Sequence, residues 1–254
     1  MGTKWALTRR LKPSDIDIES IPWDVFLRDH FRWVQGQHVS IIAPTNVGKS
    51  VLMCELQKLR QYVVVVGVKP EDDTLEQLRR PAFGGYQEMT KMPPVGKNGP
   101  TQPHVLLWPK LKRPTDYGWQ SQVIRTAMLE IWQERSWCLA VDEMGYLVRT
   151  LGLRTLVEQF WEQGRSLNIS MLAATQRPRH VPLTMYSSAS HLFLGGTNDT
   201  EDLRRLGGLN GADTAMVRII LQNLPSKLSH ELLYVDARTG FMCIVKAPFN
   251  PSRR

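Results

Sequence analysis

Residues 39 to 50 constrain the fold of this chain more than any other stretch, because an apolar segment there runs straight into a loop of distinctive spacing. Val39 to Ile42 predicts a buried strand. The next residues, Ala-Pro-Thr-Asn-Val-Gly-Lys-Ser, fit the pattern G-x-x-x-x-G-K-[ST], except that Ala43 stands where the first glycine is usual. A helix is expected from Lys49 to Arg60. This strand, loop and helix predict a phosphate-binding α/β core.

In such a loop the backbone N–H groups turn inward around the α- and β-phosphates of a nucleoside triphosphate. Lys49 is expected to contact the β- and γ-phosphates and the Ser50 hydroxyl to bind Mg²⁺, while the helix N-terminus faces the same anion. Alanine at position 43 tolerates most backbone shapes, but not one with positive φ. The residues predicted to bind ATP and Mg²⁺ here are Ala43, Pro44, Thr45, Asn46, Val47, Gly48, Lys49 and Ser50.

A second apolar run carries acidic residues at its end. Trp137 to Val141 is continuously apolar, as expected of a strand covered on both faces, and Asp142 and Glu143 follow it. Open α/β sheets bind their ligands at the carboxyl ends of the strands. We therefore expect Asp142 to be the carboxylate of the Mg²⁺ site and Glu143 to act as general base on an attacking water. The alternative is that both acids merely cap the following helix or turn.

A third apolar run, Ile169 to Ala174, is followed by Thr-Gln-Arg-Pro. Gln176 at the end of this strand could hydrogen-bond the γ-phosphate or the attacking water, or it could be an ordinary polar residue at a strand end. Pro178 is expected to end the element.

Together these motifs resemble those of the FtsK/HerA superfamily of P-loop ATPases. The segment from Gly164 to Pro178, with its A-T-Q-R-P end, is the most specific part, and the resemblance spans about residues 36 to 200. It implies a RecA/FtsK-like fold and a ring, usually a hexamer, that binds ATP between subunits. In that family pattern Gln176 is a sensor, and Arg165 would be an arginine finger for the neighbouring site.

The arginine is the least determined of these residues. Arg149, Arg154 and Arg177 compete with Arg165 for that role, and a solvated arginine at a helix C-terminus is the plain alternative.

The remaining pattern alternates strands with helices, which predicts a mainly parallel, doubly wound sheet with a C-terminal β-hairpin. Residues 81 to 103 contain five prolines and four glycines and are expected to form an irregular loop. We divide the chain into a lead-in segment, 1–35, whose aromatic residues are expected to pack rather than stack on bases, and an ATPase domain, 36–254. Further strands are predicted at Tyr62–Val68, His104–Trp108, His191–Leu194, Leu232–Asp236 and Phe241–Val245, and further helices at Thr74–Arg80, Gln120–Arg135, Leu153–Gly164, from Asp199 onward and at Ala212–Asn223.

Charge and composition bear on partners and on location. The chain carries 32 Lys and Arg against 24 Asp and Glu, a formal net charge of +8, which suits a polyanionic partner. Three widely spaced cysteines lack metal-ligand spacing and are expected to be buried and reduced. No apolar run approaches about 18 residues, so we expect a cytoplasmic protein without membrane insertion. The terminal basic residues, expected to be solvated or to contact nucleic acid, are Lys4, Arg9, Arg10, Lys12, Arg253 and Arg254.

The small size leaves little room beyond a motor domain, and in this the chain resembles the genome-packaging ATPases of viruses and phages. That resemblance implies a ring, hexameric or pentameric, that translocates double-stranded DNA and docks on a capsid portal or vertex. The protein would then act in the host cytoplasm or be associated with the virion. Candidate DNA-facing loops are 81–103, with Lys91 and Lys97, and the basic loop of Lys110, Lys112 and Arg113.

Two other classes of function stay open. One is an assembly ATPase that acts on protein, as in filamentous-phage morphogenesis, although those relatives normally carry a transmembrane segment. The other is a small-molecule P-loop kinase, which would require an arginine-rich lid and would act as a monomer.

Overall fold

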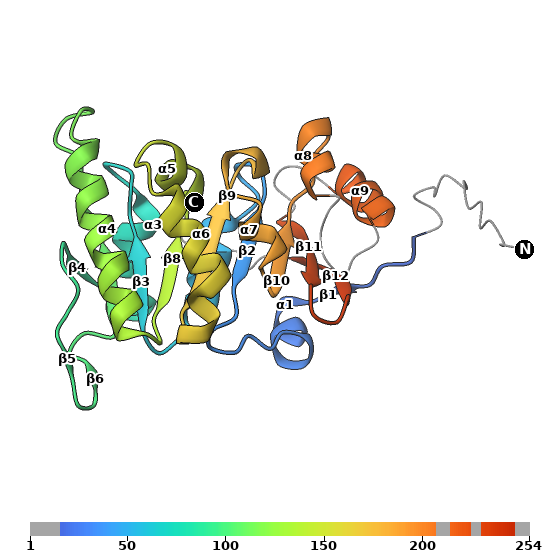
Figure 1. The fold of residues 1–254 in the computed structure, drawn as a ribbon. Coiled ribbons are helices and arrows are strands. Elements are labelled where there is room, and N and C mark those ends of the chain that lie inside the picture. Colours follow the sequence, from blue (N-terminus) through green and yellow to red (C-terminus); the bar gives the residue numbers. More distant parts are fainter. Residues whose placement is uncertain (1–15, 207–213, 225–229, 247–254) are drawn as a thin grey trace, which may run out of the picture.

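The apolar runs expected to form strands pair side by side in one sheet (Figure 1). In the computed structural model, which describes residues 16–206, 214–224 and 230–246, ten strands make this sheet in the order β1-β12-β11-β10-β2-β9-β8-β3-β7-β4. These strands are β1 (Ser20–Ile21), β2 (Val39–Ile42), β3 (Val63–Val66), β4 (Gln87–Met89), β7 (His104–Leu107), β8 (Cys138–Val141), β9 (Ser170–Thr175), β10 (His191–Leu194), β11 (Glu231–Asp236) and β12 (Met242–Lys246).

The strands from β10 to β4 in this order are all parallel, as the alternation of strands and helices predicts. β11 pairs antiparallel with both β10 and β12, which confirms the C-terminal hairpin and attaches it to the same sheet. β1 from the lead-in segment then pairs parallel with β12 and extends the sheet further.

Helices cover both faces of the sheet, because alternate residues of each central strand face opposite cores. In β3, Val64 and Val66 face one core and Val63 and Val65 face the other. The first core also contains residues of α4 (Tyr117–Glu134), α5 (Met144–Arg149), α6 (Arg154–Gln163), α7 (Thr184–Ser187), α8 (Thr200–Leu206) and α9 (Thr214–Asn223). The second contains residues of α2 (Lys49–Gln57), α3 (Asp73–Leu78) and a π-helical turn, Phe26–His30, which follows the short α1 (Trp23–Val25).

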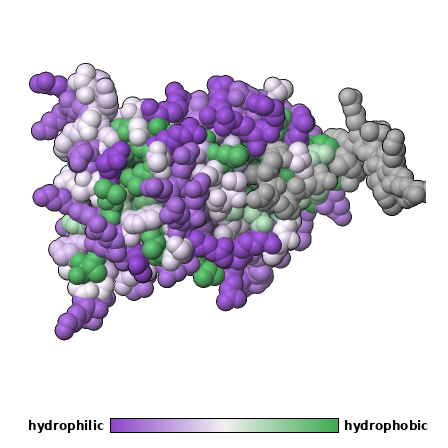
Figure 2. All heavy atoms as spheres, viewed as in Figure 1, coloured by the Kyte–Doolittle hydropathy of each residue, from purple (hydrophilic) through white to green (hydrophobic). Residues whose placement is uncertain are grey.

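This arrangement confirms the doubly wound α/β architecture. On the α4 and α6 side, hydrophilic side chains cover most of the outer surface, with apolar residues scattered among them (Figure 2). The expected helix at Ala212–Asn223 is confirmed from Thr214 onward, and its first residues lie outside the described part of the chain. The basic residues near both termini also lie outside it.

The described aromatic residues of the lead-in segment, from Trp23 to Trp33, are packed, as expected. Phe26 is fully buried, and its ring centroid lies 4.7 Å from that of Tyr234 on β11. Phe31 and Trp33 are also buried, and the indole N–H of Trp33 donates to the Gln37 carbonyl at 2.8 Å. These rings therefore belong to the second core and are not free to stack on bases.

The expectation of an irregular loop at residues 81 to 103 is partly wrong. Within it, β4 pairs parallel with β7 at the edge of the sheet, and β5 (Val95–Gly96) and β6 (Gly99–Pro100) form a separate small hairpin. These strands are not predicted from the local pattern, because the prolines and glycines around them are typical of loops. β4 forms because the open edge of β7 offers it backbone hydrogen bonds. Short 3₁₀ turns lie at Pro81–Phe83, Gly164–Leu167 and Pro178–His180.

Candidate active site

Three of the predicted motifs meet at the carboxyl edge of the sheet. β9 lies between β2 and β8, with Ile42 opposite Thr175 and Val141 opposite Ala173. The residues that follow these parallel strands therefore emerge side by side. This brings together the phosphate loop after β2, the Asp-Glu pair after β8 and Gln176 after β9.

The loop between β2 and α2 has the backbone that anion binding requires at its turning points. Gly48 has φ of 90° and Asn46 has φ of 66°, both in the left-handed region, which glycine and asparagine tolerate best. Ala43 is not among the residues with positive φ, so the missing glycine imposes no backbone strain.

Room for the extra methyl group of Ala43 comes from another strand. Gly195 follows β10, and a Cβ at that position would lie 2.5 Å from the Ala43 Cβ. A glycine beside the loop thus compensates for the alanine in it.

The expected Mg²⁺ ligands are in contact. The Ser50 hydroxyl donates to a carboxylate oxygen of Asp142 at 2.7 Å. Within the described residues no group of three or more His, Cys, Asp or Glu could hold a metal by itself. One hydroxyl and one carboxylate nevertheless fit Mg²⁺, which binds few protein oxygens and completes its shell with phosphate and water.

Lys49 lies folded over the loop. Its ammonium donates to the Pro44 carbonyl at 2.7 Å, and the residue is largely buried. Burial lowers its pKa, and the nearby carboxylates of Asp142 and Glu143 oppose that shift. The side chain therefore stays against the loop, where the motif predicts contact with a β- or γ-phosphate.

Glu143 and Gln176 form the third contact of the site. The Gln176 amide donates to a Glu143 carboxylate oxygen at 3.3 Å. Burial, with the negative charge of Asp142, raises the pKa of Glu143. A carboxylate whose negative charge is disfavoured by burial accepts a proton more readily, and this suits a general base.

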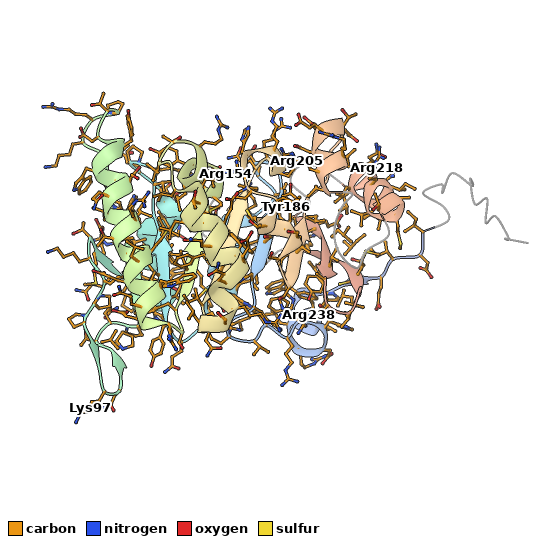
Figure 3. The ribbon with its side chains drawn as sticks, viewed as in Figure 1. Lys97, Arg154, Tyr186, Arg205, Arg218 and Arg238 are labelled. Carbon is orange, nitrogen blue, oxygen red and sulfur yellow. The ribbon has the colours of Figure 1, made fainter. Side chains whose placement is uncertain are left out.

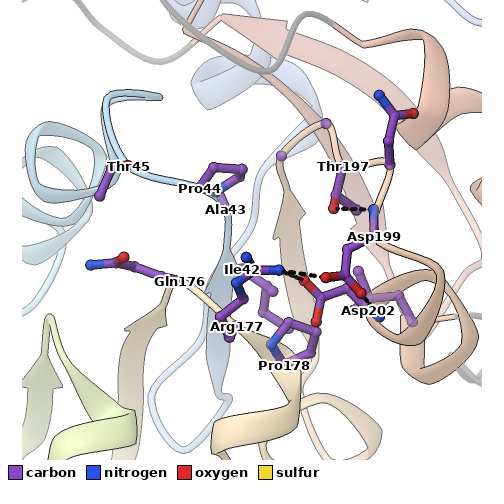
Figure 4. Close-up of a pocket in the computed structure, with 14 residues that line it drawn as sticks. Ile42, Ala43, Pro44, Thr45, Gln176, Arg177, Pro178, Thr197, Asp199 and Asp202 are labelled. Carbon is purple, nitrogen blue, oxygen red and sulfur yellow. Dashed lines mark hydrogen bonds and ion pairs between the residues drawn. The ribbon is translucent and has the colours of Figure 1, made fainter.

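Two hollows adjoin the loop and share Thr45 and Gln176. The smaller, of about 170 Å³, is lined by residues of the three motifs, among them Lys49, Asp142, Glu143 and Gln176, together with Lys69. The larger, of about 390 Å³, lies on the β10 side of the loop and is shown in Figure 4. There Arg177 donates to Asp199 at 2.8 Å and to Asp202 at 3.0 Å.

Lys69 is a residue of the site that none of the sequence motifs predicts. The residue follows β3, the neighbour of β8, and so lies at the same edge as the Asp-Glu pair. The sequence does indicate that a strand ends just before Lys69, and so places the residue at the carboxyl edge of the sheet. No motif marks the position as part of a binding site.

Arg165 is exposed and lies far from these residues in the fold. It belongs to the 3₁₀ turn that precedes β9, at the amino edge of the sheet, opposite the phosphate loop. The structure therefore does not bring it to the site of its own chain. Of its competitors, Arg149 follows the Asp-Glu pair at the end of α5, Arg154 pairs with Glu158 at 3.0 Å, and Arg177 lines the larger hollow.

Among the helices of the described residues, none combines the length and the hydropathy that a membrane span requires.

The fold and the meeting of these motifs define the chain as a protein with a P-loop ATPase fold. No protein-family model matches the sequence, and no curated protein matches it either. Solved structures do match. The genome-packaging NTPase B204 of Sulfolobus turreted icosahedral virus 2 superposes with a TM-score of 0.59 at 12% identity, over 84% of this chain and 98% of that one.

Two further structures are similar. The DNA-packaging ATPase B204 of Sulfolobus turreted icosahedral virus gives a TM-score of 0.57 at 15% identity, over 86% of this chain and all of that one. VirB4 of Thermoanaerobacter pseudethanolicus gives 0.59 at 13% identity, over 85% of this chain and 90% of that one. At these identities the likeness shows the fold. It agrees with the mainly parallel, doubly wound P-loop fold that the motifs predict.

Proposed function

We propose that the chain is an ATP-hydrolysing motor that moves double-stranded DNA, in the manner of a viral or phage genome-packaging ATPase. The observation that carries the hydrolytic part is the meeting of Lys49, the Ser50–Asp142 pair and the Glu143–Gln176 pair around one hollow. The packaging structures that share its fold, over nearly their whole length, support the motor part.

In this proposal Glu143 accepts a proton from the attacking water, and the water oxygen bonds to the γ-phosphorus. The bond from the γ-phosphorus to the bridging oxygen of the β-phosphate breaks, leaving ADP and inorganic phosphate. Lys49 balances negative charge on the β- and γ-phosphates, and Gln176 orients Glu143 or the water. Mg²⁺, held by Ser50 and Asp142, would supply further charge neutralisation on the phosphates.

The two hollows suit different parts of ATP. The smaller is lined by the residues expected to contact phosphate, so we assign the phosphates to it. The larger, on the other side of the loop, has room for the nucleoside.

DNA contact is proposed at the carboxyl edge, on the basic loop that joins β7 to α4. Lys112 and Arg113 are exposed there. Lys110 is less available to DNA, because its ammonium pairs with Glu76 at 3.0 Å and lies 3.7 Å from the centroid of the Trp108 ring. Lys97, on the β5–β6 hairpin, points away at the opposite edge, where Figure 3 labels it, and is a weaker candidate.

A ring of subunits is part of the proposal, since Arg165 could complete only a neighbour's site. Mixing two inactive variants tests this point. Lys49→Ala retains Arg165, and Arg165→Ala retains an intact phosphate loop. If Arg165 acts between subunits, the mixture regains part of the ATPase activity that each variant lacks, whereas Arg165→Ala with full activity would remove it from the mechanism.

The test of the whole proposal is steady-state ATP hydrolysis with and without long linear duplex DNA, at low and moderate salt. We expect duplex to stimulate hydrolysis and added salt to remove the stimulation, because contacts to phosphates release counterions. Hydrolysis that ignores duplex would favour an assembly ATPase that acts on protein. Transfer of phosphate to a small acceptor by a monomer would favour a kinase.

A capsid portal or vertex is the proposed docking partner, and the host cytoplasm or the virion is the proposed location. Co-sedimentation of the purified protein with empty capsids tests the docking.

A further inference from the structure

Lys69 occupies a place in the smaller hollow that the motifs do not assign. β3 and β8 are neighbours, with Val66 opposite Val141, so the residues after both strands lie side by side. Lys69 lines the hollow together with Lys49, Asp142 and Glu143.

The backbone of Lys69 is held by buried polar groups. The indole N–H of Trp108 donates to the Lys69 carbonyl at 2.7 Å. The Gln120 amide, itself fully buried, donates to the neighbouring Val68 carbonyl at 3.1 Å. Gly67 permits this arrangement, since a Cβ there would lie 2.5 Å from the Trp108 ring. The stem of Lys69 therefore starts from a fixed point beside the hollow.

Lys69 changes the balance of charge among the side chains that line the hollow. Without Lys69, its lining would contain one ammonium, that of Lys49, against the two carboxylates of Asp142 and Glu143. Such a lining would carry a net negative charge, which disfavours an incoming polyphosphate except where Mg²⁺ and the backbone N–H groups of the loop offset it. With Lys69 the positive and negative side chains balance, and both lysines are available to the incoming anion.

The ammonium of Lys69 has donors to spare. It donates to Asp72 at 3.2 Å, and within the described residues this is its sole hydrogen bond. An ammonium carries three donor hydrogens. Asp72 also caps α3, accepting from the backbone N–H groups of Thr74 and Leu75. Burial disfavours the charge of Lys69, but Asp142 and then Asp72 outweigh it, so its pKa lies above the ordinary value.

We propose that Lys69 is a second phosphate-contacting cation of the site, which donates to the terminal phosphate of a bound nucleoside triphosphate. The inference rests on the proposed function, because it requires that the hollow binds triphosphate. It makes Lys69 a determinant of the preference for triphosphate over diphosphate.

The experiment measures binding and needs no turnover. Calorimetry in the presence of Mg²⁺ gives the affinity of the full chain for a non-hydrolysable ATP analogue and for ADP. In Lys69→Met we expect the affinity for the analogue to fall about tenfold or more, as for the loss of a charged hydrogen bond, and the affinity for ADP to change less than about twofold. Lys69→Arg should keep part of the preference, because it keeps the charge.

Two variants separate this role from a structural one. Asp72→Asn removes the charge partner of Lys69 but keeps an oxygen for the helix cap, and it should leave the preference for the analogue nearly intact. Lys58→Met removes another lysine that pairs with a nearby carboxylate, Glu55 at 2.6 Å, and should change neither affinity.

The outcomes are distinct. If Lys69→Met still prefers the analogue as the unaltered chain does, or if Asp72→Asn loses the preference equally, the proposal for Lys69 is overturned and the ATPase proposal stands. If the unaltered chain binds neither ligand, both proposals are overturned. If Lys69→Met does not fold, judged by circular dichroism, Lys69→Arg and Lys69→Gln decide by the same comparison.

Discussion

The hydroxyl of Ser50 donates a 2.7 Å hydrogen bond to Asp142, 92 positions later in the chain. Both are expected ligands of Mg²⁺, and they meet because β2 and β8 are parallel strands with β9 between them. The contact links the phosphate loop to the second motif and is the geometric centre of the proposed chemistry.

Lys49→Ala should abolish hydrolysis while leaving the fold intact. The change removes the ammonium that balances charge on the β- and γ-phosphates, and a lost donor of this kind costs about 100-fold or more in kcat. Steady-state ATP hydrolysis measures the loss, and circular dichroism measures the fold. Lys58→Ala, at the C-terminal end of α2, is the matched control and should retain full activity. Global unfolding of Lys49→Ala would count against this assignment.

Glu143→Gln should separate binding from hydrolysis. Glutamine has nearly the same shape but cannot accept the proton of the attacking water, so we expect hydrolysis to fall about 100-fold to 10,000-fold. Binding of a non-hydrolysable ATP analogue should change less than about threefold. Gln176→Ala should lower hydrolysis less, because it removes only the group that orients Glu143. A Glu143→Gln protein that hydrolyses ATP at the normal rate would show that another group is the base.

Changing Lys112 and Arg113 together to Ala should weaken duplex binding in a salt-dependent way. If both contact phosphates, the slope of log affinity against log salt should become shallower by about two. Fluorescence anisotropy with a labelled duplex at several salt concentrations measures this slope. Lys110→Ala is the control, since Glu76 and Trp108 already hold that side chain. An unchanged slope in the double variant would place the DNA contact elsewhere.

Stability should fall as the pH drops from about 6.5 toward 4. His191 is fully buried and lies within 2.8 Å of the Tyr234 hydroxyl and 3.1 Å of the Gln37 side-chain oxygen. Burial lowers its pKa from 6.5 to about 4. The unfolded chain therefore binds a proton in this range and the folded chain does not.

The sign follows from that difference. Above about pH 6.5, His191 does not change the free energy of unfolding. Below that pH the free energy of unfolding falls by about 1.4 kcal/mol per pH unit, until the folded-state pKa is reached. His38, also buried with a pKa of about 4, adds a similar effect. Urea midpoints at several pH values measure the slope. His191→Gln should flatten it by about half.

Gly67→Ala should destabilise the protein by about 1–3 kcal/mol, the usual cost of overpacking. The new methyl group would meet the Trp108 ring at 2.5 Å and Leu75 at 2.8 Å. Gly118→Ala is a suitable control, because nothing lies within 4 Å of a Cβ at that position in α4. It should be neutral or slightly stabilising, since alanine favours a helix more than glycine does. Chemical denaturation of both variants checks the contrast.

Much of the site follows from the sequence because each motif is local. The strand before the phosphate loop and the helix after it are set by residues within a few positions of Gly48. Asp142 and Gln176 could be placed at the same edge because each follows a continuously apolar run, and such runs form parallel strands whose carboxyl ends lie together.

The tertiary structure alone decided features that depend on contacts between distant segments. β4 exists because β7 leaves an open edge, and the Pro- and Gly-rich pattern around it carries no strand signal. Ala43 is accommodated because Gly195 lies against it. Arg165 lies at the opposite edge because its turn precedes β9, whereas Gln176 follows that strand.

Lys69 shows most clearly the difference between what the sequence predicts and what the tertiary structure decides. The residues around Lys69 in the sequence predict only the end of a strand. The order of strands in the sheet, with β3 beside β8, brings its ammonium to the hollow that Asp142 and Glu143 line. Local pattern determines most of the helices and the central strands, because periodicity and turn chemistry act over a few residues. Which strand ends become neighbours is decided by packing both faces of the sheet at once, and that is a property of the whole chain.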